Sequence, residues 1–197
     1  MSRMRRERQA ERRDPAGKGR PWWRTLELAL WLGVAAVFVW RFAPQVGAAL
    51  GWPSRGVAAP AVTLRLLDGG TLQLDALEGN VVLLNFWATW CPPCRAEMPA
   101  FQELYDERRA AGFTVVGVAM DDGPRERVDA FLGDRAISYP VGFATPATIA
   151  AFGGVTSLPT SVLIDRRGRI RYTVRGYFAE TTLRAAVNRL LAEGGGT

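Results

Sequence analysis

Apolar and polar residues follow one another along the chain in blocks that predict strands and helices in turn. Residues 81–87 form an almost continuous apolar run, which is typical of a central strand covered on both faces. A helix is expected at 92–111, ending at Gly112, because glycine commonly terminates helices. The other predicted elements are strands at 62–67, 71–74, 113–120, 160–165 and 169–175, and helices at 125–132, 148–152 and 181–191. This order predicts an α/β fold in which helices flank a central mixed sheet, preceded by an N-terminal hairpin turning at Asp68-Gly69-Gly70.

A basic segment and an apolar segment precede this folded part. Residues 1–24 are polar and strongly basic, and residues 26–43 are apolar except for Glu27 and Arg41 near the ends. Eighteen such residues are enough to span a bilayer, and three tryptophans stand where interfacial aromatic residues are expected, at positions 22, 23 and 40. The basic residues would stay in the cytoplasm by the positive-inside rule, so the rest of the chain is expected outside.

Two other interpretations of the apolar segment remain open. A cleaved signal peptide has the same basic front, and Val46-Gly47-Ala48 is compatible with a cleavage site, whereas a buried soluble helix would need a packing partner. The expected division is a cytoplasmic tail at 1–25, a transmembrane anchor or signal sequence at 26–43, a linker at 44–59 rich in Gly, Ala and Pro, and one domain at 60–193. The expected location is therefore the cell membrane, with a single pass and a periplasmic or otherwise extracytoplasmic domain.

Charge and composition exclude several classes of function for that domain. Residues 1–43 hold ten Lys and Arg against four Asp and Glu, whereas residues 44–197 hold fifteen of each. The folded part is therefore neutral and lacks the basic patch of a nucleic-acid-binding domain. The chain has no histidine, which excludes Ser-His-Asp and Cys-His catalysis and removes the commonest zinc and copper ligand.

The two cysteines of the chain stand three residues apart, where a buried strand meets a helix. In this context Trp90-Cys91-Pro92-Pro93-Cys94 is typical of a redox pair. Cys91 would be the helix N-cap, where the helix dipole favours a thiolate, and prolines are tolerated at the first two helical positions. Cys91 is expected to attack and the less exposed Cys94 to resolve the mixed disulfide. The alternatives are half of a zinc site, for which further Cys or His ligands are missing, or a structural disulfide, which would close a very small loop.

The residues around the cysteines resemble the thioredoxin superfamily, and more narrowly its membrane-anchored branch of the TlpA, ResA and CcmG type. The resemblance spans roughly residues 58–192 and rests on VVLLNFWATWCPPCRAEMP and on Ser157-Leu158-Pro159-Thr160. It implies a thioredoxin-like fold, thiol–disulfide oxidoreductase activity and a cis Leu158–Pro159 bond lying against the cysteines. Substrate contacts are expected from Trp90, Pro92, Pro93, Leu158 and Pro159. No cofactor is implied beyond a redox-active Cys91–Cys94 disulfide, and no metal.

Glu97 is the expected proton carrier of this site. Cytoplasmic-type thioredoxins have a buried Asp six residues before the first cysteine, where this chain has Asn85, which cannot accept a proton. Glu97 matches a glutamate of the ResA type and falls on one helical stripe with Phe101, Leu104 and Tyr105. If that stripe is buried, the pKa of Glu97 is raised and the carboxyl can exchange protons with the cysteines. The alternative is a solvated surface glutamate.

Two other charged groups carry no predicted role. The arginine-rich run at 166–171 is interpreted as a hairpin tip with solvated side chains, and Asp121-Asp122 as the polar end of a strand.

The resulting hypothesis is a reductase of disulfides in exported proteins, for example apocytochrome c or copper-site assembly proteins. A membrane electron donor of the CcdA/DsbD type would recharge it. The alternatives are a disulfide-forming oxidant, a thiol peroxidase with Arg95 as its activating residue, and, from another class, a copper-binding chaperone.

Overall fold

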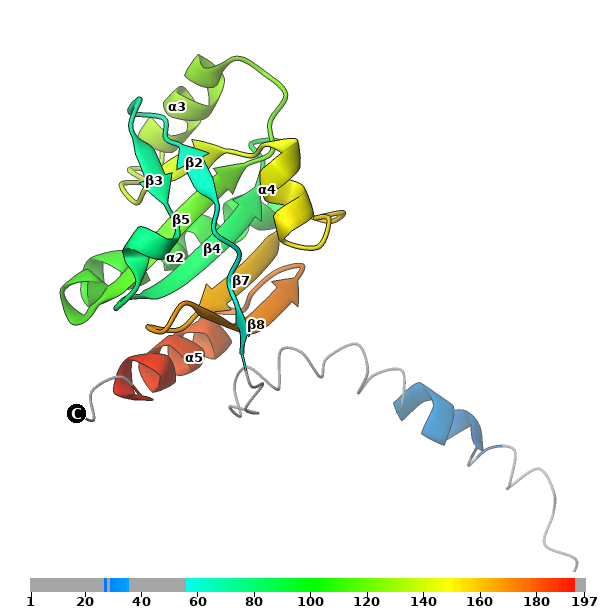
Figure 1. The fold of residues 1–197 in the computed structure, drawn as a ribbon. Coiled ribbons are helices and arrows are strands. Elements are labelled where there is room, and N and C mark those ends of the chain that lie inside the picture. Colours follow the sequence, from blue (N-terminus) through cyan, green and yellow to red (C-terminus); the bar gives the residue numbers. More distant parts are fainter. Residues whose placement is uncertain (1–26, 28, 36–55, 194–197) are drawn as a thin grey trace, which may run out of the picture. The chain divides into compact units, whose positions relative to one another are not determined.

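The computed structural model describes residues 27, 29–35 and 56–193 (Figure 1). The elements after residue 56 are β1 (Val57–Ala58), β2 (Thr63–Arg65), β3 (Thr71–Gln73), η1 (Asp75–Leu77), β4 (Val81–Trp87), α2 (Pro92–Arg108), η2 (Arg109–Ala111), β5 (Phe113–Ala119), α3 (Arg125–Gly133), β6 (Val141–Phe143), α4 (Pro146–Ala151), β7 (Thr160–Ile164), β8 (Arg169–Arg175) and α5 (Glu180–Glu193). Their order is that of the predicted α/β fold.

Six of the strands form one mixed sheet, in the order β1-β8-β7-β4-β5-β6. Strand β4 pairs in parallel with β5 and antiparallel with β7, and β6 extends the parallel side. Strands β2 and β3 form a separate antiparallel hairpin. The predicted mixed sheet and N-terminal hairpin are therefore confirmed.

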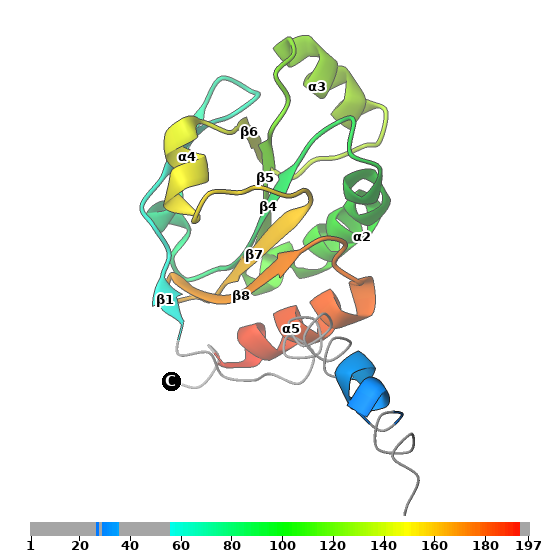
Figure 2. The ribbon, with the colours of Figure 1, turned by 90° about the vertical axis from the view of Figure 1, so that its right-hand side faces the viewer.

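The sheet lies between two layers (Figure 2). Helices α2 and α5 cover one face, and α4 with the β2–β3 hairpin covers the other. Because side chains alternate along a strand, Leu83 and Trp87 of β4 pack under the helices while Leu84 and Phe86 pack toward the hairpin and α4. Every residue of β4 is buried, as its continuous apolar run predicts.

Several boundaries differ from the predictions. The helix predicted at 92–111 continues its last turn as the 3₁₀ helix η2, and Gly112 ends it with a φ of 87°. Strand β6 was not predicted, because three residues after Pro140 are too few to show a period. Strand β1 lies inside the range predicted as a linker, where Val57 and Ala58 pair with Ile170 and Arg169 of β8.

The segment ahead of this domain is only partly described. Residues 27 and 29–35 are helical, and the rest of the predicted tail, anchor and linker up to residue 55 lies outside the described residues. Within the described parts of the chain, no helix combines the length and apolar character that a membrane crossing requires.

Candidate active site

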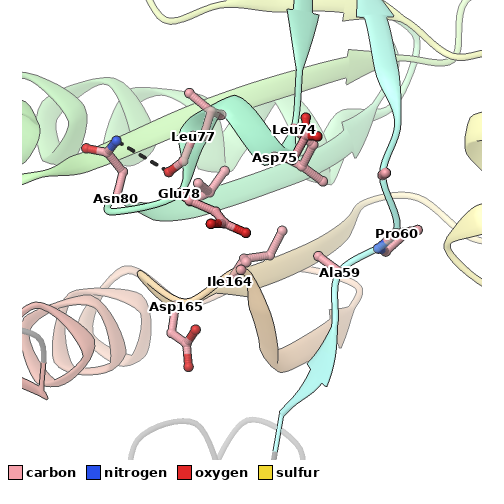
Figure 3. A pocket seen from close by; sticks show the side chains of 12 residues that line it. Ala59, Pro60, Leu74, Asp75, Leu77, Glu78, Asn80, Ile164 and Asp165 are labelled. Carbon is pink, nitrogen blue, oxygen red and sulfur yellow. Dashed lines mark hydrogen bonds between the residues drawn. The ribbon is translucent and has the colours of Figure 1, made fainter.

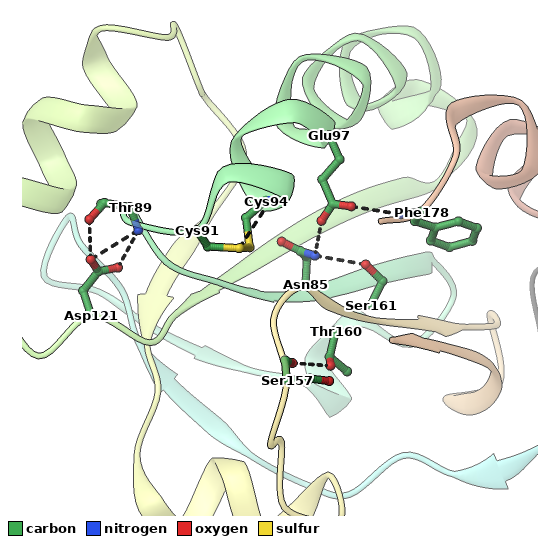
Figure 4. Close-up of a disulfide and its surroundings, with 10 residues drawn as sticks. All are labelled: Asn85, Thr89, Cys91, Cys94, Glu97, Asp121, Ser157, Thr160, Ser161 and Phe178. Atoms are coloured by element: carbon green, nitrogen blue, oxygen red, sulfur yellow. Dashed lines mark hydrogen bonds between the residues drawn. A yellow bond between two sulfur atoms is a disulfide. The ribbon is translucent and has the colours of Figure 1, made fainter. Parts of the chain in front are cut away.

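Cys91 and Cys94 form a disulfide at the first turn of α2, with their Cα atoms 5.3 Å apart (Figure 4). Cys91 has extended backbone angles and caps the helix, and its Sγ accepts a hydrogen bond from the Cys94 backbone N–H at 3.3 Å. Pro92 and Pro93 occupy the first two helical positions, where no helical hydrogen bond is lost. The predicted N-cap geometry is therefore confirmed.

The two sulfurs differ in how they meet the surface. Cys91 is 3% exposed and Cys94 is fully buried. Cys91 also borders an open groove of about 370 Å³, which Cys94 does not line. Cys91 is therefore the more accessible of the two sulfurs.

Most of the residues that were predicted to contact the substrate line that groove. Trp90, Pro92, Pro93 and Leu158 line it, as do four residues that were not predicted, namely Met120, Val155, Thr156 and Ser157. None of the lining residues carries a charge. Trp90 is 66% exposed at its rim, an unusual position for so large an apolar side chain.

Pro159, unlike Leu158, does not line the groove. The Leu158–Pro159 bond is cis, as the resemblance implied. Pro159 is buried, and its carbonyl oxygen accepts a hydrogen bond of 2.7 Å from the backbone N–H of Gly176. Leu158 thus lines the groove and Pro159 does not, and a direct substrate contact at either residue stays a prediction.

The turn that carries Trp90 and Cys91 is anchored by Asp121. The Asp121 carboxylate accepts hydrogen bonds from the Thr89 backbone N–H at 3.1 and 3.2 Å and from the Thr89 hydroxyl at 2.5 Å (Figure 4). Sequence reasoning assigned Asp121 no role. The available signal was topological, since β4 and β5 are parallel and their ends, followed by Thr89 and Asp121, meet at one edge of the sheet.

Glu97 lies on the buried side of α2, as predicted, and is 1% exposed. Its Oε1 accepts a hydrogen bond from Asn85 Nδ2 at 3.0 Å, and its Oε2 accepts one from the Phe178 backbone N–H at 3.1 Å (Figure 4). Desolvation raises the pKa of Glu97 to about 8, although both hydrogen bonds act to lower it. The interpretation of Glu97 as a solvated glutamate is therefore wrong.

Asn85 connects Glu97 to the strand that follows the cis-proline. Its Nδ2 donates a second hydrogen bond of 3.0 Å to Ser161 Oγ, and both side chains are buried. Burial raises the pKa of Tyr139, and the charge of Glu97 raises it further. A buried polar cluster with one readily titrating carboxyl thus lies beside the disulfide.

Other hollows lie away from the disulfide. One of about 60 Å³ lies at the opposite end of the sheet, between η1 and the end of β7, and its wall includes Asp75, Glu78 and Asp165 (Figure 3). A wider groove of about 750 Å³ runs between α3 and the β2–β3 hairpin. Among the described residues, no three or more His, Cys, Asp or Glu side chains are grouped so that they could hold a metal ion.

Comparison with known proteins places these features in a family. The family model described as Redoxin matches residues 54–190. The chain is 36% identical over 137 residues to the thiol-disulfide oxidoreductase ResA of Oceanobacillus iheyensis, covering 68% of this chain and 71% of that protein. It is 35% identical over 115 residues to ResA of Halalkalibacterium halodurans, covering 58% of this chain and 65% of that protein. The chain thus spans about two thirds of the length of these relatives.

Solved structures of thiol–disulfide exchange proteins are also similar to this chain. A thiol:disulfide interchange protein of the thioredoxin family from Chlorobium tepidum matches with a TM-score of 0.65 and 34% identity, over 70% of this chain and 98% of that one. A secreted thiol-disulfide isomerase from Corynebacterium glutamicum matches with a TM-score of 0.62 and 31% identity, over 68% and 85% of the two chains.

Proposed function

Because the chain belongs to the redoxin family and is a thiol–disulfide oxidoreductase, we propose that it reduces disulfides of exported proteins on the extracytoplasmic side of the membrane. The observation that carries this proposal is the Cys91–Cys94 disulfide at a helix N-terminus, with Cys91 open to an uncharged groove and Glu97 buried beneath. Apocytochrome c and copper-site assembly proteins are the substrates of this kind that we propose first.

The reducing direction follows from how weakly the Cys91 thiolate is stabilised. A strong oxidant holds its reduced form through heavy stabilisation of the thiolate. Here Pro92 and Pro93 lack backbone N–H groups, and within residues 56–193 the Cys94 amide is the donor to Cys91 Sγ. When Glu97 is charged, its buried carboxylate further disfavours a negative charge on sulfur. Both features favour a pair that gives electrons away.

The proposed reaction begins with the reduced protein. The Cys91 thiolate attacks one sulfur of the substrate disulfide, and the first substrate thiolate leaves and takes a proton from water. Cys94 then gives its proton to the Glu97 carboxylate and attacks Cys91 Sγ, which releases the second substrate thiolate and forms the Cys91–Cys94 disulfide. Two electrons have passed to the substrate, and one proton has moved from Cys94 to Glu97.

The return half of the cycle needs a reductant outside the cytoplasm. We propose a membrane electron donor of the CcdA/DsbD type, which would supply two electrons while Glu97 returns its proton to Cys94. The basic tail and the apolar residues 26–43 support an anchored protein with the catalytic domain outside. A dithiol carrier fixed to the same membrane would meet this domain often.

Trapping in cells tests this proposal. A Cys94→Ser variant cannot resolve its mixed disulfide, so it is expected to retain exported substrates on Cys91, with a Cys91→Ser, Cys94→Ser variant as the matched control. The reduction potential, measured by equilibration with glutathione or dithiothreitol, is expected below that of the glutathione pool. A potential near that of DsbA, or a trap that captures only an oxidising membrane partner, would assign the oxidant function instead.

A further inference from the structure

Glu97 is surrounded by hydrogen-bond donors, which suits only one of its two protonation states. Asn85 Nδ2 and the Phe178 backbone N–H both donate to it. A charged carboxylate accepts hydrogen bonds and gives none, so this arrangement satisfies the charged form. A protonated carboxyl has one O–H that must find an acceptor, because a buried donor without a partner is costly. Proton exchange at Glu97 therefore requires an acceptor that can be presented on demand.

Asn85 is the neighbour able to present one. Its amide carries an oxygen that accepts and a nitrogen that donates, and the two ends occupy nearly the same space. Turning the amide by half a rotation would place Oδ1 where Nδ2 now lies, toward Glu97 Oε1 and Ser161 Oγ. The Ser161 hydroxyl accepts in the present arrangement and can donate in the reversed one. The Phe178 backbone N–H has no such freedom.

We propose that Asn85 and Ser161 form a paired positioning unit that reverses its hydrogen bonds each time Glu97 takes up or releases a proton. With Glu97 charged, Asn85 Nδ2 donates to both the carboxylate and Ser161. With Glu97 protonated, Asn85 Oδ1 accepts from both the carboxyl and the Ser161 hydroxyl. Asn85 then makes one hydrogen bond to Glu97 and one to Ser161 in each protonation state, and the change needs no movement of the backbone. The inference rests on the proposed role of Glu97 in proton exchange, but not on the substrate.

The groups facing Glu97 allow its titration to be observed cleanly. Cys94 lies one turn earlier on α2, Asn85 on β4, Ser161 on β7, the Phe178 amide just before α5, and Tyr139 just before β6. A disulfide does not titrate, and burial with the charge of Glu97 keeps Tyr139 neutral. In the oxidised protein, Glu97 is thus the member of this cluster that changes charge near neutrality.

Nuclear magnetic resonance of the oxidised full chain in detergent micelles tests the proposal. The chain has three asparagines, Asn80, Asn85 and Asn188, so asparagine-selective labelling gives three side-chain amides and two internal controls. The Glu97 carboxyl carbon and the Asn85 amide nitrogen are followed from about pH 6 to about pH 10, two units on either side of the Glu97 pKa of about 8. The nuclear Overhauser effects from the Asn85 amide protons to the Ser161 β protons are compared at the two ends.

The expected result is one shared midpoint for Glu97 and Asn85, with Overhauser effects to Ser161 that are strong above it and severalfold weaker below it. A Glu97→Gln variant should show no pH dependence at Asn85. If Glu97 titrates while the Asn85 effects stay unchanged, or if Glu97 does not titrate in this range, the proposal is overturned. Neither outcome bears on whether the protein reduces exported disulfides.

A Ser161→Ala variant gives a second, functional readout. It leaves one Asn85 N–H without a partner when Glu97 is charged, whereas the reversed Asn85 oxygen still accepts from a protonated Glu97. The charged form is thus penalised, so the Glu97 midpoint and the pH–rate profile of disulfide reduction should both move up by about one unit. A merely structural Ser161 would lower thermal stability and leave both midpoints where they are.

Discussion

A buried carboxyl lies one helical turn beyond Cys94, and we expect it to change how the two thiols ionise once the disulfide is reduced. Glu97 is 1% exposed, and the groups that donate hydrogen bonds to it, the Asn85 side chain and the Phe178 amide, are neutral. A negative charge held there would oppose a thiolate on the adjacent cysteines, so we expect the three groups to titrate as a coupled set in the reduced protein.

Replacement of Glu97 by Gln keeps the shape of the side chain and removes its charge and its proton. We expect Glu97→Gln to lower the apparent pKa of the Cys91 thiol and to slow the reduction of a model disulfide. Thiolate absorbance against pH and a turnover assay measure the two effects. Glu103→Gln is a suitable control, because Glu103 is an exposed residue of the same helix that pairs with Arg184. Equal titrations and rates in parent and Glu97→Gln would show that the proton takes another route.

The roles of the two cysteines can be separated by alkylation. Cys91 caps the helix and borders the groove, whereas Cys94 is fully buried. Limiting iodoacetamide should therefore label Cys91 first in the reduced protein, since the more exposed thiolate reacts faster. Peptide mass spectrometry identifies the labelled residue. Preferential labelling of Cys94 would reverse the assignment of attacking and resolving thiols.

At the scale of elements, the turn between β4 and α2 is held by a contact between the segments that follow β4 and β5. The two oxygens of Asp121 share the backbone N–H of Thr89, two residues before Cys91, and Oδ1 also accepts a hydrogen bond from the Thr89 hydroxyl. Hydrogen bonds to a charged group stabilise by roughly 1.5–3 kcal/mol. We expect Asp121→Asn to destabilise the protein by about 2 kcal/mol and Thr89→Val by about 1 kcal/mol, with a coupling above about 0.5 kcal/mol in the double variant.

Urea denaturation of the parent, the two single variants and the double variant measures the coupling free energy between Asp121 and Thr89. Asp122→Asn serves as the control, because it removes the adjacent carboxylate and leaves the Asp121–Thr89 contact in place. Additive effects of Asp121→Asn and Thr89→Val would mean that the contact does not hold the turn.

Helices and strands with a regular apolar pattern, or with residues that mark their ends, were predictable from the sequence. The run at 81–87 coincides with β4, and the helix expected from residue 92 begins there because Cys91 caps it and two prolines suit its first turn. The burial of Glu97 was also predictable, since it shares a helical stripe with Phe101 and Leu104, both of which are buried.

Features fixed by distant partners were not predictable. Strands β1 and β6 are too short to show a period and exist because β8 and β5 pair with them. The arginines predicted to be solvated at 166–171 include Arg166, which donates to the Gly79 and Ala111 carbonyl oxygens, and Arg169, which donates to the Gly56 carbonyl oxygen. A charge run alone does not show which backbone carbonyls will lie beside it.

At the scale of the whole molecule, the uneven charge predicts topology. All of the net charge of +6 lies in residues 1–43, ahead of and within the apolar segment. We expect alkaline phosphatase fused after Thr197 to be active and to sediment with membranes, since the positive-inside rule would keep the basic end in the cytoplasm. An inactive fusion would place the domain inside, and activity in the soluble periplasmic fraction would favour cleavage of the apolar segment.

The stability of the oxidised protein should fall as pH rises through neutrality. Folding raises the pKa of Glu97 from 4.5 to about 8, so the folded state holds this proton more tightly than the unfolded state does. The resulting stabilisation is complete below about pH 4.5 and is lost as pH rises to about 8, a difference of about 4 to 5 kcal/mol at most. A loss of stability in this pH range can be assigned to Glu97, because the chain has no histidine and its two cysteines are joined in a disulfide. Glu107, whose pKa is lowered by its hydrogen bond to Arg184, acts in the opposite direction and only at acidic pH.

Urea denaturation at constant ionic strength between about pH 5 and about pH 9 should therefore give a free energy of unfolding that falls with pH for the parent and stays nearly constant for Glu97→Gln. Parallel slopes for the two proteins would mean that Glu97 does not hold its proton more tightly in the folded state, and the source of the pH dependence would then lie outside the buried cluster.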